Sequence, residues 1–111
     1  MKHLYHATKN KNFYDIYDEG LKPGWDGLIY FCTEKEHAVN WIAMSCSKGE
    51  EIACFRVRVS DLDQEKIKDG YDHDPNYFKG VTVKTYSENI SPDSLEDDEG
   101  LDIWGEVYTV L

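Results

Sequence analysis

Basic residues are scarce in this sequence of 111 residues. Twelve Lys and Arg stand against 22 Asp and Glu, which gives a net charge of −10 at pH 7, and only two of the twelve are arginines. Binding along a nucleic-acid backbone needs clustered positive charge, so the composition argues against it. The same imbalance leaves open a protein that imitates nucleic acid or binds a basic partner.

The sequence also lacks paired cysteines, the spacing of zinc ligands and long apolar runs. Cys32, Cys46 and Cys54 show no C-x-x-C spacing and are odd in number, which favours free thiols in a reducing compartment. The sequence has no apolar run of transmembrane length, secretory leader or lipidation motif, so we expect a cytoplasmic protein without membrane contact. His73 stands between Asp72 and Asp74, a pattern better explained by a hydrated loop, and we expect no metal.

Apolar and aromatic residues are plentiful enough for a globular fold. Hydrophobic residues make up 41% and aromatic residues 14% of the chain. At this length we expect a single domain over residues 1–111 that buries about 65% of the surface of the unfolded chain. The sequence contains no repeat and no low-complexity linker.

The stretch from residue 28 to residue 42 is the clearest structural signal. Leu28–Cys32 is short, apolar and bounded upstream by glycine and proline, which predicts a buried strand. Thr33 and Glu36 form a capping box, which predicts a helix that begins directly after the strand. Residues at helical spacing predict that this helix packs on a sheet by one face: Ala38, Trp41 and Ile42.

The remaining strands and helices are predicted from the alternation of apolar and polar residues and from the glycine and proline residues at their ends. We expect a first strand that begins at residue 3 and ends near His6, and further strands at residues 51–59, 80–86 and 102–111. We also expect a short helix around residues 13–17 that ends at Gly20. Pro92 suits a first helical position. In the 51–59 strand, one face carries Ala53, Phe55, Val57 and Val59, which predicts a half-buried strand. Strands outnumber helices, so the fold class is α+β.

Three polar residues occupy strand positions: His6, Tyr30 and Glu106. An acid within the apolar and aromatic run at the end of the chain is costly unless it faces water, a partner or a site. Each residue also has a plainer explanation. His6 suits a strand end, Tyr30 suits a core position with its hydroxyl satisfied, and Glu106 suits an edge strand protected from aggregation.

Taken in order and with their neighbours, the three residues resemble the ADP-ribosyltransferase fold. The resemblance is to its His-Tyr-Glu branch, which includes diphtheria-toxin-like enzymes and poly-ADP-ribose polymerases. It implies two packed antiparallel-rich sheets with a few short helices around a cleft. It rests on four segments that are similar to the family's first strand, the helix end that follows, the tyrosine strand and the late acidic strand: Leu4–Thr8, Asp18–Pro23, Leu28–Phe31 and Glu106–Tyr108.

The resemblance implies that NAD is the substrate. Glu106 would then stabilise the oxocarbenium-like state that forms when the nicotinamide–ribose bond breaks. His6 would bind the adenosine-side ribose, with Thr8 beside it in the NAD-binding strand, and Tyr30 would stack on the nicotinamide ring. Trp41 stands where the family often has a second aromatic residue, eleven positions after the tyrosine.

Trp25 is the only large apolar residue in the loop over residues 22–27. A tryptophan in a glycine-rich loop suits a flap over a pocket or a plug in the core, and both remain open. We include Trp25 among the candidate NAD-binding residues and expect it near the mouth of the cleft with Trp41.

Differences between this sequence and related families argue against several other activities. Arginine-specific toxins have an arginine in the first strand, where this chain has His3 and His6, and a second acid two positions before the catalytic one, where this chain has Trp104. RNA 2′-phosphotransferases of this fold need several basic residues. His6-Ala7-Thr8 also matches the His-x-Thr motif of two-histidine phosphoesterases, but the sequence has no second copy.

We therefore expect an NAD-dependent ADP-ribosyltransferase-like protein that transfers ADP-ribose to a macromolecular acceptor or hydrolyses NAD. We expect the acceptor to be a protein, although the sequence leaves a nucleic-acid base or end open. The alternative is a non-enzymatic acidic inhibitor or adaptor that presents carboxylates to a basic partner. A solvated loop is the simpler explanation of the acidic residues on which this alternative depends: Glu96, Asp97, Asp98, Glu99 and Asp102.

Overall fold

The computed structural model describes residues 2–70, 82–96 and 105–110, and only the backbone of residues 105 and 106. The elements are strands (β), α-helices (α) and short 3-10 helices (η). In chain order they are β1 (His3–Lys9), η1 (Asn10–Asn12), α1 (Phe13–Glu19), β2 (Ile29–Cys32), α2 (Lys35–Ala43), β3 (Glu51–Arg58), η2 (Val59–Asp61), η3 (Gln64–Lys66), β4 (Lys68–Asp69), β5 (Val83–Tyr86), η4 (Pro92–Ser94), β6 (Leu95–Glu96) and β7 (Gly105–Thr109).

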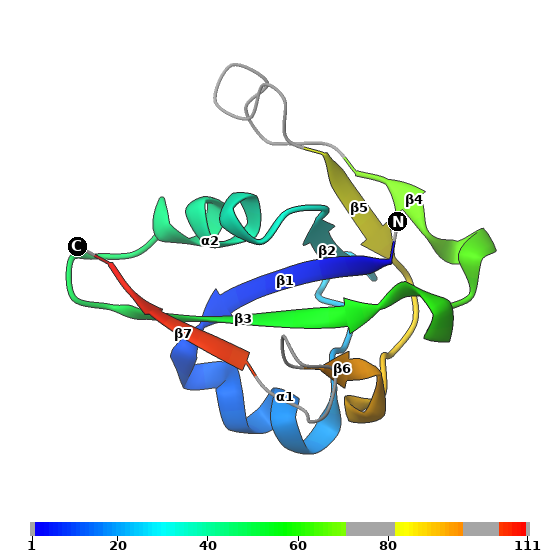
Figure 1. Ribbon diagram of the computed structural model, residues 1–111, viewed down its shortest axis with the longest axis horizontal. Coiled ribbons are helices and arrows are strands. Elements are labelled where there is room, and N and C mark those ends of the chain that lie inside the picture. The colour runs from blue at the N-terminus through cyan, green and yellow to red at the C-terminus, as the bar shows by residue number, and fades with distance from the viewer. Residues whose placement is uncertain (1, 71–81, 97–104, 111) are drawn as a thin grey trace.

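The described strands form one seven-stranded sheet in the order β4-β5-β2-β1-β3-β6, with β7 also paired to β3 (Figure 1). Each described pairing is antiparallel. The α+β class with an antiparallel sheet is thus confirmed, whereas the expectation of two packed sheets is wrong for these strands. The reason is that β1 pairs with both β2 and β3 and joins the two halves of the sheet.

The helices cover opposite faces of the sheet. In Figure 1, α2 lies on one side of β1 and β3, while α1 lies on the other side. The predicted Thr33 cap is wrong: α2 has Glu34 at its N-cap position, without a side-chain capping bond. The backbone N–H of Thr33, one residue after the end of β2, instead donates to the carbonyl of Thr82 at 3.2 Å, just before β5. None of the helices in the described ranges is long and apolar enough to span a bilayer.

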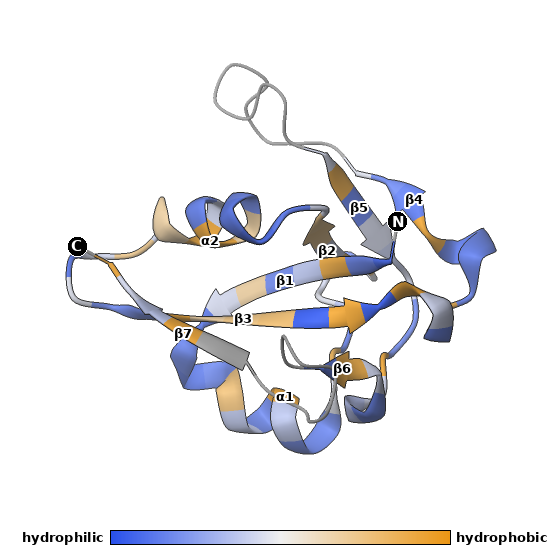
Figure 2. Cartoon of the chain, viewed as in Figure 1, coloured by the Kyte–Doolittle hydropathy of each residue, from blue (hydrophilic) through white to orange (hydrophobic). Residues whose placement is uncertain are grey.

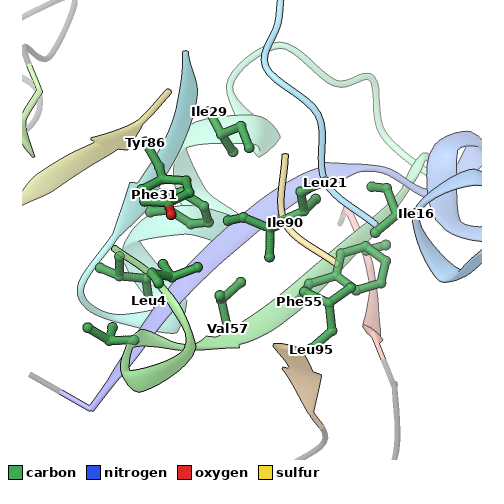
Figure 3. Packing of buried hydrophobic residues seen from close by; sticks show 13 residues of the cluster. Leu4, Ile16, Leu21, Ile29, Phe31, Phe55, Val57, Tyr86, Ile90 and Leu95 are labelled. Carbon is green, nitrogen blue, oxygen red and sulfur yellow. The ribbon is translucent and has the colours of Figure 1, made fainter. Parts of the chain in front are cut away.

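The larger apolar cluster, called the α1-side cluster below, lies between the sheet and α1. Figure 3 shows its bulky side chains converging from strands, α1 and the connecting segments. Phe31, Phe55 and Leu4 are among its completely buried members. The cluster consists of Leu4, Ile16, Leu21, Ile29, Phe31, Ala53, Phe55, Val57, Val59, Leu62, Tyr86, Ile90 and Leu95.

The smaller cluster, called the α2-side cluster below, lies under α2. Its buried members are Ala7, Cys32, Ala38, Ile52, Cys54 and Val83, and Trp41 and Ile42 pack against them as the helical spacing predicts. Because this cluster covers the second face of β3, the strand is buried on both faces from Ile52 to Phe55, whereas Arg56 and Arg58 leave its other end half-buried as predicted. Figure 2 agrees: β3 is largely apolar, whereas the edge strand β4 is largely hydrophilic.

Gly20 ends α1 and brings the chain back against the η4 region. Its φ is +81°, and a Cβ at this position would come within 2.0 Å of the carbonyl oxygen of Ile90. A side chain is therefore excluded by both the backbone conformation and the space. The close approach allows Leu21 and Ile90 to exchange backbone hydrogen bonds of 2.9 and 2.8 Å.

The outer edge of β3 is shared between two short partners. Its Arg56 and Val57 pair with β6, and its residues from Glu51 to Phe55 pair with β7. The ends of the 97–104 stretch are therefore held at adjacent positions of one strand. The 71–81 stretch is similarly flanked, since Gly70 donates from its N–H to the carbonyl of Val83 at 2.9 Å.

Candidate functional site

A cavity of about 360 Å³ opens where β1 and β2 separate. β1 pairs with β3 from His3 to Lys9, but its register with β2 is limited to Tyr5 opposite Cys32. Residues on both sides of the gap line the cavity: Tyr5, His6, Ala7, Thr8, Lys22, Gly24, Leu28, Ile29, Tyr30, Phe31, Cys32, Ala38, Trp41 and Ile42. The volume lies within the range of small-molecule sites.

The side chain of His6 makes a hydrogen bond across this gap, where the backbones of β1 and β2 are not paired. Its Nδ1 lies 2.9 Å from the carbonyl oxygen of Tyr30. A carbonyl only accepts, so Nδ1 carries the proton and the Nε2 of a neutral ring is left as an acceptor. Burial lowers the pKa of His6 and outweighs the opposing effect of the Tyr30 bond, so the neutral form is favoured. The imidazole also meets the Phe31 ring edge-on at 5.8 Å.

Thr8 follows two residues later on the same strand and also lines the cavity. Asn12, in the turn after β1, donates from Nδ2 to the Thr8 hydroxyl oxygen at 2.9 Å. This leaves the Thr8 hydroxyl proton available for another acceptor. His6 and Thr8 therefore offer one acceptor and one donor, a combination suited to a sugar with several hydroxyl groups.

Tyr30 and Trp41 form an aromatic corner in the cavity wall. Their ring centroids are 6.0 Å apart and the ring planes are nearly perpendicular, at 81°. The Tyr30 hydroxyl donates to Oδ2 of Asp26 at 2.5 Å. This bond raises the pKa of Tyr30 and lowers the pKa of Asp26. A flat aromatic ligand can stack against such a corner.

Trp25 does not contribute to the cavity wall. Its side chain is 100% exposed, and it is absent from the described lining residues although its neighbour Gly24 is among them. It is therefore not a plug in the core. The loop carries Trp25 into solvent on the same turn that presents Asp26 to Tyr30.

Glu106 lies on β7, and its backbone pairs with Cys54 of β3. Cys54 in turn pairs with Ala7 of β1, which lines the cavity. This register places the backbone of Glu106 two strands from the cavity, in the same row as Ala7. The Glu106 side chain is outside the described residues, as are Trp104, His73 and the acidic residues 97–102.

A second cavity of about 250 Å³ adjoins the first. The two share His6, Thr8 and Lys22, and the second is also lined by Asn12, Asp15 and Glu19. Among the described residues that line the first cavity, Lys22 is the sole Lys or Arg. Its Nζ lies 3.1 Å from Oε2 of Glu19, and both side chains are largely exposed.

Sequence reasoning did not find Lys22 and Asp26 as site residues. Lys22 lies in the Gly-Leu-Lys-Pro segment, and its position as the first residue of the loop was the available signal. Asp26 precedes a glycine, which indicates a turn but does not reveal that the side chain reaches a tyrosine four residues later.

Glu96 has a different environment from the one the acidic-surface alternative requires. It is 7% exposed and forms ion pairs with His3, Arg56 and Arg58. A buried carboxylate held by three basic groups cannot belong to an exposed acidic row. The prediction that Glu96 joins a phosphate-like row is therefore wrong.

The surroundings of Cys32 and Cys46 disfavour the reactive thiolate form. All three thiols are free, and Cys32 and Cys54 are buried. Burial raises the pKa of the Cys32 thiol to about 11, so the thiol is protonated and inert at neutral pH. Within the described part of the chain, His, Cys, Asp and Glu do not form a group of three suited to a metal ion.

No protein-family model matches the chain, and no curated protein matches it in sequence. The resemblance to ADP-ribosyltransferases therefore rests on the residues quoted above.

Proposed function

We propose that this protein binds NAD in the cavity between β1 and β2 and transfers ADP-ribose to a macromolecular acceptor, most simply a protein. The observation that carries the proposal is that four residues chosen from the sequence line one cavity: His6, Thr8, Tyr30 and Trp41. They come from two strands and a helix, and the separation of β1 from β2 brings them together.

The nicotinamide ring is assigned to the aromatic corner. A positively charged pyridinium is attracted by the faces of Tyr and Trp, and this attraction adds to ordinary stacking. A ribose is assigned to His6 and Thr8. The neutral imidazole accepts from a sugar hydroxyl at Nε2, and the Thr8 hydroxyl donates to a sugar oxygen.

The diphosphate is assigned to Lys22. NAD carries two phosphate charges that need a cation in a protein with a net charge of −10, and Lys22 lies at the junction of the two cavities. A dinucleotide is long, and the adjoining cavities offer it a continuous path past Lys22. Glu19 competes for the same ammonium group in the absence of ligand.

The reaction breaks the bond between nicotinamide nitrogen and ribose carbon. The electron pair leaves with nicotinamide, positive charge develops on the ribose, and an acceptor nucleophile then bonds to that carbon and loses a proton. Glu106 is proposed to stabilise the developing charge. Preorganised electrostatic contacts of this kind contribute factors of about 10²–10³ to rate.

The proposal is tested by release of nicotinamide from NAD with the wild-type protein and the Glu106→Gln variant. We expect the variant to bind NAD with similar affinity in calorimetry but to lose about 10²-fold or more in rate, because the amide keeps the shape and removes the charge. Glu51→Gln is the matched control, since Glu51 is an exposed acid on the neighbouring strand. Absence of NAD binding by the wild type would refute the proposal, and full activity of Glu106→Gln would refute the role of this residue.

A further inference from the structure

The loop that leads into β2 is held closed by its own hydrogen bonds. The N–H of Gly24 donates to the carbonyl of Leu28 at 3.1 Å, and the N–H of Gly27 donates to the carbonyl of Gly24 at 3.0 Å. Gly27 has a φ of +79°, a conformation that strongly favours glycine. These features fix the backbone of the loop, and therefore the positions from which its side chains extend.

Both carboxylate oxygens of Asp26, in this loop, accept hydrogen bonds. Its Oδ1 accepts the N–H of Leu28 at 3.1 Å, and its Oδ2 accepts the hydroxyl of Tyr30 at 2.5 Å. The first bond fixes the carboxylate relative to the backbone, so the second holds the tip of the Tyr30 ring. The other end of Tyr30 is fixed in β2, where its backbone pairs with Thr85 of β5.

A carboxylate bonded to a phenol also changes the electrostatics of the ring. A phenol that donates to an anion becomes more electron-rich, and a hydrogen bond of this kind is stronger than one between neutral groups. The raised pKa of Tyr30 and the lowered pKa of Asp26 agree with a proton that stays on the tyrosine and a carboxylate that stays charged. A more negative ring face attracts a cation more strongly.

Resting on the proposed function, we infer that Asp26 is a specificity-determining residue that makes the Tyr30 face selective for a cationic ring. The oxidised nicotinamide of NAD is a cationic pyridinium, whereas the reduced dihydropyridine ring of NADH is neutral and has nearly the same size. Asp26 therefore favours the oxidised dinucleotide, which is the form whose ribose bond can be cleaved. Cleavage turns the pyridinium into neutral nicotinamide, so the same preference weakens once the bond is broken and aids release of the product.

The test compares the dissociation constants of NAD and NADH, measured by calorimetry, for the wild type and Asp26→Asn. The amide keeps the shape and the acceptor for Leu28 but removes the charge. We expect the affinity for NAD to fall about twofold to fivefold, the range of an exposed cation–π contact, and the affinity for NADH to change less than this. Asp63→Asn is the matched control, because Asp63 makes the same type of bond to the backbone N–H two residues on, at Glu65, and does not line the cavity.

A second variant separates polarisation of the ring from the direct field of the carboxylate. Tyr30→Phe keeps a ring and removes the hydroxyl that connects it to Asp26. We expect Asp26→Asn to change the NAD-to-NADH affinity ratio in the wild-type background and to change it little in the Tyr30→Phe background. Equal weakening of both ligands would make Asp26 purely structural and overturn the inference while the proposed function stands. An unchanged ratio, or an equal shift in both backgrounds, would overturn it too. Failure of the wild type to bind NAD would overturn both.

Discussion

The two faces of the sheet are packed with side chains of very different size. The α1-side cluster contains Phe31, Phe55, Leu4 and many other large residues. On the opposite face, four of the six buried members of the α2-side cluster are alanine or cysteine. The difference explains where the cavity lies, because small side chains beneath a helix leave space that bulky ones would fill.

The contrast is sharpest on β3, which contributes to both clusters. Phe55 faces the α1-side cluster and Cys54 faces the α2-side cluster, although the two residues are neighbours in sequence. One face of the same strand thus supplies bulky side chains to the α1-side cluster, and the other packs beneath α2, whose Ala38, Trp41 and Ile42 line the cavity. Stability and binding are divided between the faces, and substitutions should separate them.

The largest effect is expected from Phe55→Ala. This change removes a completely buried ring from the α1-side cluster and should lower the free energy of unfolding by about 3–5 kcal/mol. Cys54→Ala, on the other face, should cost only about 1 kcal/mol, close to the average point substitution. Chemical denaturation of both variants measures the difference, and similar losses would show that the two faces contribute equally.

An intermediate effect is expected from filling the cavity with Ala38→Leu. Ala38 is buried and lines the cavity, so the added methyl and methylene groups should enter the space proposed for NAD. We expect affinity for NAD to fall about tenfold or more, equivalent to about 1.4 kcal/mol. The cost in stability should be smaller, because the cavity has room that a packed core lacks.

The control for this prediction is Ala43→Leu, on the same helix. Ala43 packs against the α2-side cluster but is not a lining residue. Calorimetry with NAD should give an affinity close to that of the wild type for this variant. If Ala38→Leu binds NAD as tightly as Ala43→Leu, the ligand does not occupy this cavity.

The smallest effect is expected from His6 and pH. Burial lowers the pKa of His6 below its ordinary value of 6.5, so between the two values the unfolded chain binds more protons than the folded one. The stability that comes from a neutral His6 is therefore present above pH 6.5 and is lost as the pH falls. Denaturation of the wild type and His6→Asn across this range should show a shallower loss in acid for the variant. Equal slopes for the two proteins would contradict the assignment.

Sequence periodicity predicted the elements better than their arrangement. The strands at β1, β2 and β3, the glycine at the end of α1 and the proline at the start of η4 follow from local chemistry, and the structure contains each of them. The Thr33 cap was wrong because Thr33 is held by a backbone bond to Thr82 of a distant segment, and the helix begins after Glu34. Pairing between distant strands also joined the expected two sheets into one.

Only part of the candidate site could be predicted, because local sequence patterns reveal residues on strands and helices but not the conformation of a loop. His6 and Tyr30 were visible because each is a polar residue at a strand position, and Thr8 and Trp41 were added by the resemblance to the ADP-ribosyltransferase fold. Asp26 was not visible, because its importance comes from a hydrogen bond whose geometry depends on the loop conformation. Trp25 was visible by its size, but size does not indicate whether a loop residue points toward the cavity or into solvent.

The shared edge of β3 has a consequence for the length of the chain. Glu96 of β6 lies opposite Arg56 and Gly105 of β7 lies opposite Phe55, so folding of the sheet brings together the two described residues that flank residues 97–104. For a flexible segment, the closure entropy grows only with the logarithm of its length, and each doubling costs about 0.6 kcal/mol. Insertions at this place should therefore be tolerated, and a peptide tag or an additional recognition segment can be accommodated there without disturbing the cavity on the far side of β1.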